Sequence, residues 1–112
     1  MLTGDRLTEF QTHYWRRQAC VFRNAVDISA YPIGIKDVCE LALSELVESR
    51  MINPDYELFL GPFERSDESD GFLPENHLLL VQCLEQHLDA AASLLSDQFH
   101  FIPTWQVDDV MA

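Results

Sequence analysis

The stretch that decides the fold is the final one, Phe101-Ile102-Pro103-Thr104-Trp105-Gln106-Val107-Asp108-Asp109-Val110-Met111. Pro103 interrupts the chain, Trp105 offers a large side chain for packing, and Asp108 and Asp109 form an acidic pair. The residues that follow, Val110-Met111, have the character of a strand that is just beginning, and one residue later the sequence stops. A useful strand needs about five residues, so we expect this chain to be the front of something larger.

The length, composition and charge of the chain limit the number of domains and the kinds of partner it can have. With 112 residues the chain is one domain or less, and 47% hydrophobic residues are ordinary for a globular protein. There are 19 acidic and 7 basic residues, a net charge of −12. Such a charge repels phosphate backbones and anionic lipid, which argues against DNA, RNA and membrane surfaces as partners. A basic polypeptide is the better candidate partner, and the alternative is that the charge only keeps the chain soluble.

Cysteine usage and the N-terminus indicate the compartment. Cys20, Cys39 and Cys83 are widely spaced and form no Cys-x-x-Cys pair, which argues against a disulfide framework or a zinc knuckle. The first residues lack the apolar core of a signal peptide, and the longest apolar run, residues 78–81, is far too short to span a bilayer. We therefore expect a cytoplasmic protein.

The first half of the chain predicts two helices and three strands. Leu7, Phe10 and Tyr14 share one face of a helix over residues 3–15. The other predictions are a short strand over 19–23, a loop over 24–34, a helix over 35–46, and strands over 47–52 and 56–60. Asn53-Pro54-Asp55 is a strong turn signal, so these two strands should form a hairpin, which Gly61-Pro62 would end.

The second half predicts mainly helix. The acidic residues 64–71 have no periodicity and are expected to form a mobile solvent loop. Pro74 suits the first turn of a helix over residues 75–87. Helical spacing continues to Leu95, so a further helix should follow directly or after a break near Asp89. The strand that begins at Val110 would close the series.

The tempting motif for chemistry is His87-Leu88-Asp89, because His-x-Asp supplies two of the three ligands of the facial triad that holds non-haem iron. Residues two apart point the same way on a strand, but diverge by about 200° on a helix. Here the motif lies in a predicted helix, so a helix end at the surface is the better interpretation.

Other candidate sites are weaker still. Cys83 and His87 would share a helix face, but two ligands do not make a metal site and His77 falls on another face. The acidic run at residues 67–70 lacks the spacing of a calcium loop. Asp108 and Asp109 could be catalytic, or could cap and position the strand that follows, and the second interpretation is preferred. No glycine-rich phosphate loop or Gly-x-Ser-x-Gly motif is present.

Read together, five short motifs resemble the N-terminal part of the bacterial ribosomal oxygenases, in the same order and spacing. They are His13-Tyr14-Trp15-Arg16-Arg17-Gln18 before Cys20-Val21-Phe22-Arg23; Leu41-Ala42-Leu43 before Val47-Glu48-Ser49-Arg50-Met51; Gly61-Pro62-Phe63-Glu64; Leu79-Leu80-Val81-Gln82; and Ile102 to Met111. The chain departs from the family at Ala19, where proline is usual, in the loop 30–34, and at Ala112, where a small polar residue is expected.

The resemblance implies a cupin-type, JmjC-like hydroxylase that depends on Fe(II) and 2-oxoglutarate and modifies an arginine of a large-subunit ribosomal protein. It implies an α+β fold in which residues 1–112 form an incomplete, helix-rich flank of a double-stranded β-helix barrel whose core is missing. In the family the His-x-Asp iron pair follows the Asp-Asp-x-Met strand, so the resemblance assigns no catalytic, cofactor-binding or metal residue here. Trp105 would be a packing anchor, and Asp108-Asp109 would position the first barrel strand.

Three functions remain open. A fragment of a 2-oxoglutarate-dependent hydroxylase would be inactive alone and would self-associate through an uncovered apolar flank. A stand-alone, non-enzymatic acidic binding module would cover that flank with polar residues. A small metalloenzyme using His77, Cys83 and His87 would bind metal stoichiometrically.

Overall fold

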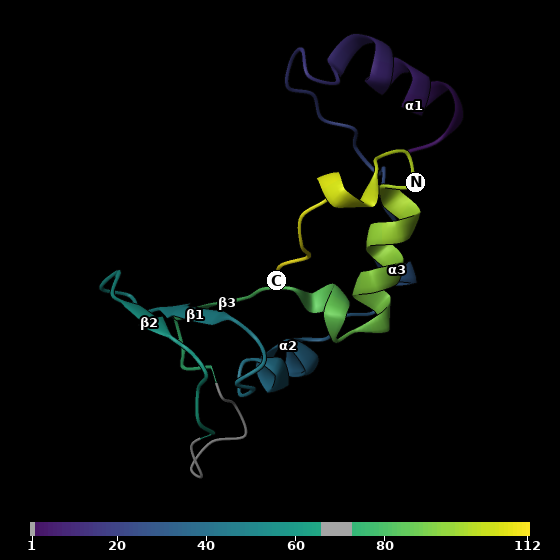
Figure 1. Cartoon of the computed structure of the whole chain (residues 1–112). Helices are drawn as coiled ribbons and strands as arrows, with labels where there is room; N and C mark the ends of the chain where they lie inside the picture. Colours follow the sequence, from purple (N-terminus) through teal and green to yellow (C-terminus); the bar gives the residue numbers. More distant parts are fainter. Residues whose placement is uncertain (1, 66–72) are drawn as a thin grey trace.

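The computed structural model describes residues 2–65 and 73–112, and the fold is a small α+β arrangement. Its helices are α1 (Gly4–Glu9), α2 (Ile35–Leu41) and α3 (Asp89–Gln98), and its strands are β1 (Ser49–Ile52), β2 (Leu58–Leu60) and β3 (Leu78–Val81). Figure 1 shows α1 and the sheet at opposite ends of the molecule, with α2 and α3 between them. The expected acidic loop and its run at 67–70 fall largely outside the described residues.

The sheet is antiparallel, with the strand order β2-β1-β3. The predicted hairpin is confirmed: Met51 pairs with Phe59, and Asn53 holds the turn by accepting hydrogen bonds from the backbone N–H groups of Asp55 and Glu57. At the end of β2, the Gly61 N–H donates to the Ser49 carbonyl at 2.9 Å. A Cβ atom at Gly61 would lie 2.0 Å from the Ser49 hydroxyl oxygen, so only glycine allows this close approach.

The third strand corrects the prediction of a helix over residues 75–87. Met51 of β1 pairs with Leu79 of β3, and Pro74 lies in a turn closed by a hydrogen bond from the His77 N–H. The spacing of Leu78, Val81 and Leu84 fits a helix, but a short continuous apolar run also fits a strand, and the pairing with β1 decides between them. Cys83 then has φ 56°, a left-handed conformation that ends the strand direction and leads into a 3-10 turn over Leu84–Gln86.

The other three helix predictions are confirmed, although their bounds differ. Helix α1 continues as a π-helical turn over Phe10–Tyr14, close to the predicted 3–15. Helix α2 ends at Leu41 instead of residue 46, because tighter turn hydrogen bonds follow it and the Ala42 carbonyl accepts from the Phe63 N–H. Helix α3 corresponds to the predicted second helix after Asp89. None of the helices among the described residues has the length and apolarity needed to cross a membrane.

The predicted strand over residues 19–23 is wrong. Its Val21 is 81% exposed and none of the described strands pairs with the segment. The adjacent Phe22 instead makes edge-to-face contacts with Phe10 and Tyr14, at ring-centroid distances of 6.1 and 5.8 Å. Phe10 also meets Phe101 at 6.0 Å. This aromatic cluster packs the N-terminal helix against Phe101, near the end of the chain. Aromatic side chains can pack edge to face in this way without belonging to a strand.

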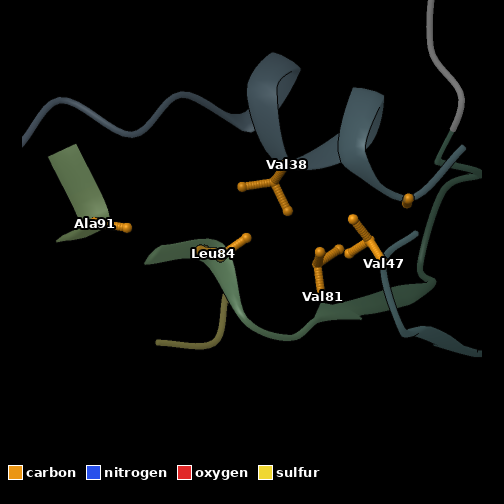
Figure 2. Close-up of a cluster of buried hydrophobic side chains, with 6 residues drawn as sticks. Val38, Val47, Val81, Leu84 and Ala91 are labelled. Carbon is orange, nitrogen blue, oxygen red and sulfur yellow. The ribbon is translucent and has the colours of Figure 1, made fainter. Parts of the chain in front are cut away.

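A small core joins α2, β3 and α3. Leu84 and Val81 are fully buried, and Figure 2 shows Val38 of α2 pointing toward them. Val47, Ala42 and Ala91 complete the buried cluster. A polar contact supports it from one side, since the Tyr31 hydroxyl donates to Asp97 at 3.0 Å and accepts from the Gln98 amide at 2.9 Å. The core therefore fixes β3 and the turn after it, where the last residues of the chain dock.

Candidate functional site

The last four residues are held against the end of β3 by backbone hydrogen bonds. Ala112 and Val81 exchange two of them, with N···O distances of 2.7 and 3.1 Å, and the Leu84 N–H donates to the Val110 carbonyl at 2.9 Å. A pair of residues that exchanges both bonds is the hydrogen-bonded pair of an antiparallel ladder. Val110 to Ala112 thus run beside the end of β3 with one ladder pair formed, although no strand is assigned to them, so the predicted strand stays a prediction.

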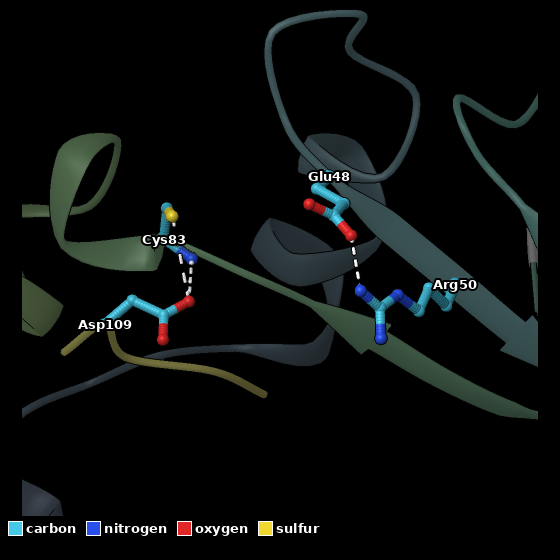
Figure 3. Close-up of polar contacts among 4 residues, drawn as sticks. All are labelled: Glu48, Arg50, Cys83 and Asp109. Atoms are coloured by element: carbon cyan, nitrogen blue, oxygen red, sulfur yellow. Dashed lines mark hydrogen bonds and ion pairs between the residues drawn. The ribbon is translucent and has the colours of Figure 1, made fainter.

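Two carboxylates fix the same segment. A carboxylate oxygen of Asp109 accepts a hydrogen bond from the backbone N–H of Cys83 at 3.0 Å (Figure 3). The thiol of Cys83 lies 3.7 Å from the same oxygen. Glu85 accepts from the Val110 N–H at 3.0 Å. Both bonds are charge-assisted and join the turn after β3 to the new strand. Of the two interpretations of the acidic pair, the structure supports positioning: Asp109 holds the strand, whereas Asp108 is exposed.

The electrostatics of this contact favour an ionised acid beside a neutral thiol. The hydrogen bond from the Cys83 backbone lowers the pKa of the Asp109 carboxyl below its usual value. Partial burial, followed by the nearby charge of Asp109, raises the pKa of the Cys83 thiol. A raised thiol pKa opposes formation of the nucleophilic thiolate. The surroundings of Cys83 therefore suit a structural role and not that of a nucleophile.

An uncovered aliphatic face is the second feature of the site. Residues directly opposite one another in a sheet point to the same side, so the register places Arg50, Leu60 and Leu80 on one face. Ile52, Leu58 and Leu78 lie on the same face by the same rule. Among them Leu58 is 58% exposed, and Leu60 and Leu78 are each 69% exposed. The opposite face carries Met51 and Val81, which are buried on the α2 side.

Arg50 is the charged residue at the centre of this face. Its guanidinium lies 2.5 Å from the carboxylate of Glu48, the residue just before β1 (Figure 3). Both side chains are about half exposed, so the pair contributes little to stability. The pairing does, however, make the centre of the aliphatic face electrically neutral on a chain whose net charge is −12.

Cavities flank the terminal strand on both sides. One of about 510 Å³ lies between α2 and the open edge of β3, and its lining includes Ile33, Ile35, Leu79 and Met111. The other, about 410 Å³, is lined by residues that include Leu95, Phe99 and Val107. Both are predominantly apolar, which suits packing of further polypeptide more than binding of a charged metabolite.

The residues considered for metal binding are not brought together. His87 ends the 3-10 turn, Asp89 begins α3, and both are exposed. Cys83 does not share a helix face with His87, because Cys83 has a left-handed backbone outside any α-helix. Within residues 2–65 and 73–112 no three His, Cys, Asp or Glu side chains form a group that could hold a metal. The described residues therefore do not fit an iron centre.

Trp105 is not a packing anchor within the described part of the chain. It lies in a 3-10 turn over Thr104–Gln106 and is 79% exposed. The sequence analysis expected an uncovered apolar flank, but it did not identify the residues that form the uncovered sheet face. The signal was nevertheless present, because Leu58-Phe59-Leu60 and the run 78–81 are apolar at both alternating positions, as in strands covered on both faces.

Comparison with known proteins supports the resemblance read from the sequence, although no family model matches the chain. A Haemophilus influenzae protein named "Probable ribosomal oxygenase" is 34% identical over 106 residues, which cover 91% of this chain and 26% of that protein. The Escherichia coli "Ribosomal protein uL16 3-hydroxylase" is 26% identical over 106 residues, covering 92% of this chain and 27% of that protein.

Solved structures give the same result. YcfD, a ribosomal oxygenase from Escherichia coli, matches with a TM-score of 0.73 and 28% identity, over 94% of this chain and 29% of that chain. YcfD in complex with cobalt and 2-oxoglutarate matches with a TM-score of 0.65 and 29% identity, over 97% of this chain and 30% of that chain. The resemblance is thus confirmed: nearly the whole chain is similar in sequence and fold to a part of the ribosomal oxygenases, and it spans about a quarter of the length of the curated relatives it matches.

Proposed function

We propose that this chain is the N-terminal part of an Fe(II)- and 2-oxoglutarate-dependent hydroxylase that modifies an arginine of a ribosomal protein. The observation that carries the proposal is the similarity to ribosomal oxygenases over 91% of the chain. Its role there is structural: residues 1–112 flank the catalytic barrel, position its first strand through Asp109, and leave the chemistry to the rest of the protein.

The uncovered sheet face supports this role. Leu58, Leu60 and Leu78 are each more than half exposed on one side of a three-stranded sheet. Contiguous exposed aliphatic side chains mark surfaces that another polypeptide covers. In the proposed full-length protein the barrel packs here, and in the isolated chain the same face leads to self-association. A stand-alone acidic binding module, the alternative, would be expected to carry polar residues on this side.

The cofactors and the substrate belong to the proposed full-length protein. YcfD has been solved in complex with cobalt and succinic acid and in complex with cobalt and 2-oxoglutarate. These ligands support Fe(II) and 2-oxoglutarate as the cofactors of the proposed full-length protein. No described residue of this chain is assigned to either, so the chain alone is expected to be inactive. The net charge of −12 would favour approach of a basic ribosomal protein.

The proposal includes a cytoplasmic location, where ribosomes are found. The cysteines that the structure describes, Cys20, Cys39 and Cys83, are all unpaired thiols, which suits a reducing compartment. Cell fractionation with an antibody against residues 1–112 tests the location: the proposal expects the antigen with the cytosolic and ribosomal fractions, and its recovery from the cell envelope would contradict it.

Sequencing the source gene beyond the Ala112 codon tests the proposed function. The proposal expects a glycine-rich turn followed by a His-x-Asp pair, in frame or behind a single frameshift. Unrelated sequence after a clean stop would remove the hydroxylase role for this chain and bring forward the acidic binding module.

A further inference from the structure

We propose that the N-terminal unit, residues 2–23, carries a binding surface for single-stranded RNA. The surface consists of the exposed side chains of Trp15 and of four arginines, Arg6, Arg16, Arg17 and Arg23. It lies outside everything that the hydroxylase role assigns to this chain. Only the choice of RNA over DNA rests on the proposed function, through the cytoplasmic location that it includes.

The charge of the chain is distributed unevenly between this unit and the rest. The N-terminal unit holds four of the seven basic residues but only two of the nineteen acidic ones, so its net charge is +2. The residues after it carry a net charge of −14. The overall charge of −12, which argued against nucleic acid as a partner, therefore does not describe the N-terminal end, where an anion is attracted.

The arginines of the N-terminal unit are not neutralised by carboxylates. Other basic side chains of the molecule are paired, as Lys36 is with Glu40 and Arg50 with Glu48. Within residues 2–65 and 73–112, no such ion pair involves an arginine of the N-terminal unit. Unpaired cations that gather at one end of a strongly acidic chain indicate that an external anion is their partner.

Single contacts hold these guanidinium groups in place. Arg6 lies over the Phe22 ring, 5.4 Å from its centroid, and donates a hydrogen bond to the Arg23 carbonyl at 3.0 Å. Arg17 donates to the carbonyl of Thr12. A guanidinium has five N–H donors, so each of the two keeps most of its donors for other acceptors. Their fork geometry matches the oxygens of a phosphate group, which arginine can bind with two parallel hydrogen bonds.

Trp15 adds a surface on which bases can stack. The residue is 38% exposed, and Phe10 and Phe101 meet its ring edge to face at centroid distances of 5.5 and 6.5 Å. The Arg16 guanidinium lies over the same ring, 5.8 Å from its centroid. Bases of single strands stack on aromatic rings and on guanidinium planes. An acidic polypeptide would match the charge but would make no use of this exposed pair, which favours RNA.

The acidic residues of the sheet lie too far away to cancel the attraction. Figure 1 shows α1 and the sheet at opposite ends of a molecule whose long axis measures 52 Å. At physiological ionic strength the field of an exposed charge is screened over about 8 Å. The two ends of the molecule therefore present opposite signs of charge to a partner.

Binding of a short fluorescein-labelled oligouridine to residues 1–112, followed by fluorescence anisotropy, tests the proposal. If each arginine neutralises one phosphate, the logarithm of the affinity should fall with the logarithm of the salt concentration with a slope of about −3. Replacing two arginines together, R16A with R17A, should weaken binding roughly tenfold at low salt and bring the slope to about −1.4. The pair R16K and R17K keeps both charges and should keep the slope of the wild type.

A matched control removes the same charge elsewhere. K36A with R65A also lowers the net charge by two, at exposed residues outside the N-terminal unit, and should change the affinity less than about twofold. Circular dichroism of each variant checks that the fold is retained. No binding by the wild type, or equal weakening by both alanine pairs, would overturn the proposal. Displacement of the RNA by an oligoglutamate at equal charge concentration would overturn it in favour of an acidic polypeptide. The gene sequence tests the proposed function independently of these results.

Discussion

The carboxylate of Asp109 lies 3.0 Å from the backbone nitrogen of Cys83, although the two residues are 26 positions apart in the chain. Cys83 is the left-handed residue at which the chain turns away from β3, and Asp109 is the residue just before the terminal strand begins. One hydrogen bond thus joins the end of one strand to the start of its neighbour. Leu84, the residue after Cys83, is fully buried, so this hydrogen bond also connects the terminal segment to the core.

Replacing Asp109 should weaken this attachment in graded steps. The D109A substitution removes the acceptor and should lower Tm by several degrees. D109N should have a smaller effect, because an amide oxygen can still accept from the Cys83 N–H without the charge. The exposed neighbour Asp108 gives the matched control, since D108A should leave Tm almost unchanged. Equal Tm values for D108A and D109A would contradict the assigned role.

The same contact should contribute to the pH dependence of stability. Because the pKa of Asp109 is lower in the folded chain than in the unfolded one, its stabilisation is present above the unfolded pKa of about 3.9. It is lost as pH falls through the folded value. The difference in urea midpoint between wild type and D109N should therefore be largest near neutral pH and shrink in acid. A difference that grows in acid would have the wrong sign.

Leu84 is fully buried in the core beside β3 and α3. The substitution L84A should cost about 2–5 kcal/mol of unfolding free energy through lost burial and the cavity it leaves. Because a small domain has about 5–15 kcal/mol in total, this variant should be largely unfolded on mild heating. L46A, at an 86% exposed leucine, is the control and should behave as wild type in circular dichroism melts. A stable L84A would indicate a different core.

Self-association should depend on the aliphatic sheet face. A triple variant, L58T, L60T and L78T, replaces exposed leucines with β-branched polar residues that suit a strand. It should sediment as a monomer and bind less of the dye ANS, with little change in Tm. The L46T variant alters an exposed leucine outside the sheet and should associate like wild type. If the triple variant associates as strongly as wild type, another surface is responsible.

Metal titration distinguishes the scaffold role from the small metalloenzyme. Co(II) added to residues 1–112 should produce no saturable absorption band, because the described residues bring no three ligands together. The H87A variant should titrate identically. Stoichiometric binding that H87A abolishes would establish the metalloenzyme instead.

Local signals in the sequence predicted the parts of the fold that local physics controls. The Asn53 turn specified the hairpin because its side chain bonds the backbone two and four residues on. The helix beginning at Asp89 was similarly readable from its apolar spacing. Both features depend mainly on contacts among residues close in sequence.

Long-range pairing accounts for the errors. Leu78 and Val81 fit a helical repeat, and only their partnership with β1 makes them a strand. Val21 has a strand-forming side chain but finds no strand partner among the described residues. The Asp109 contact likewise depends on the left-handed backbone of Cys83. A cysteine in the sequence does not indicate this conformation. The motif at His87 was placed in a helix because of the same helical repeat, whereas His87 follows a 3-10 turn and Leu88 has an extended backbone before α3 begins at Asp89.

In the proposed function, these residues are the scaffold of a ribosomal protein hydroxylase whose chemistry lies elsewhere in the full-length protein. The most direct test compares residues 1–112 with the full-length gene product, each incubated with Fe(II), 2-oxoglutarate and ribosomal protein uL16, with succinate formation and substrate mass as readouts. We predict that the full-length protein forms succinate and adds one oxygen atom to an arginine, and that residues 1–112 do neither. Hydroxylation by residues 1–112 alone, or none by the full-length protein, would contradict the account.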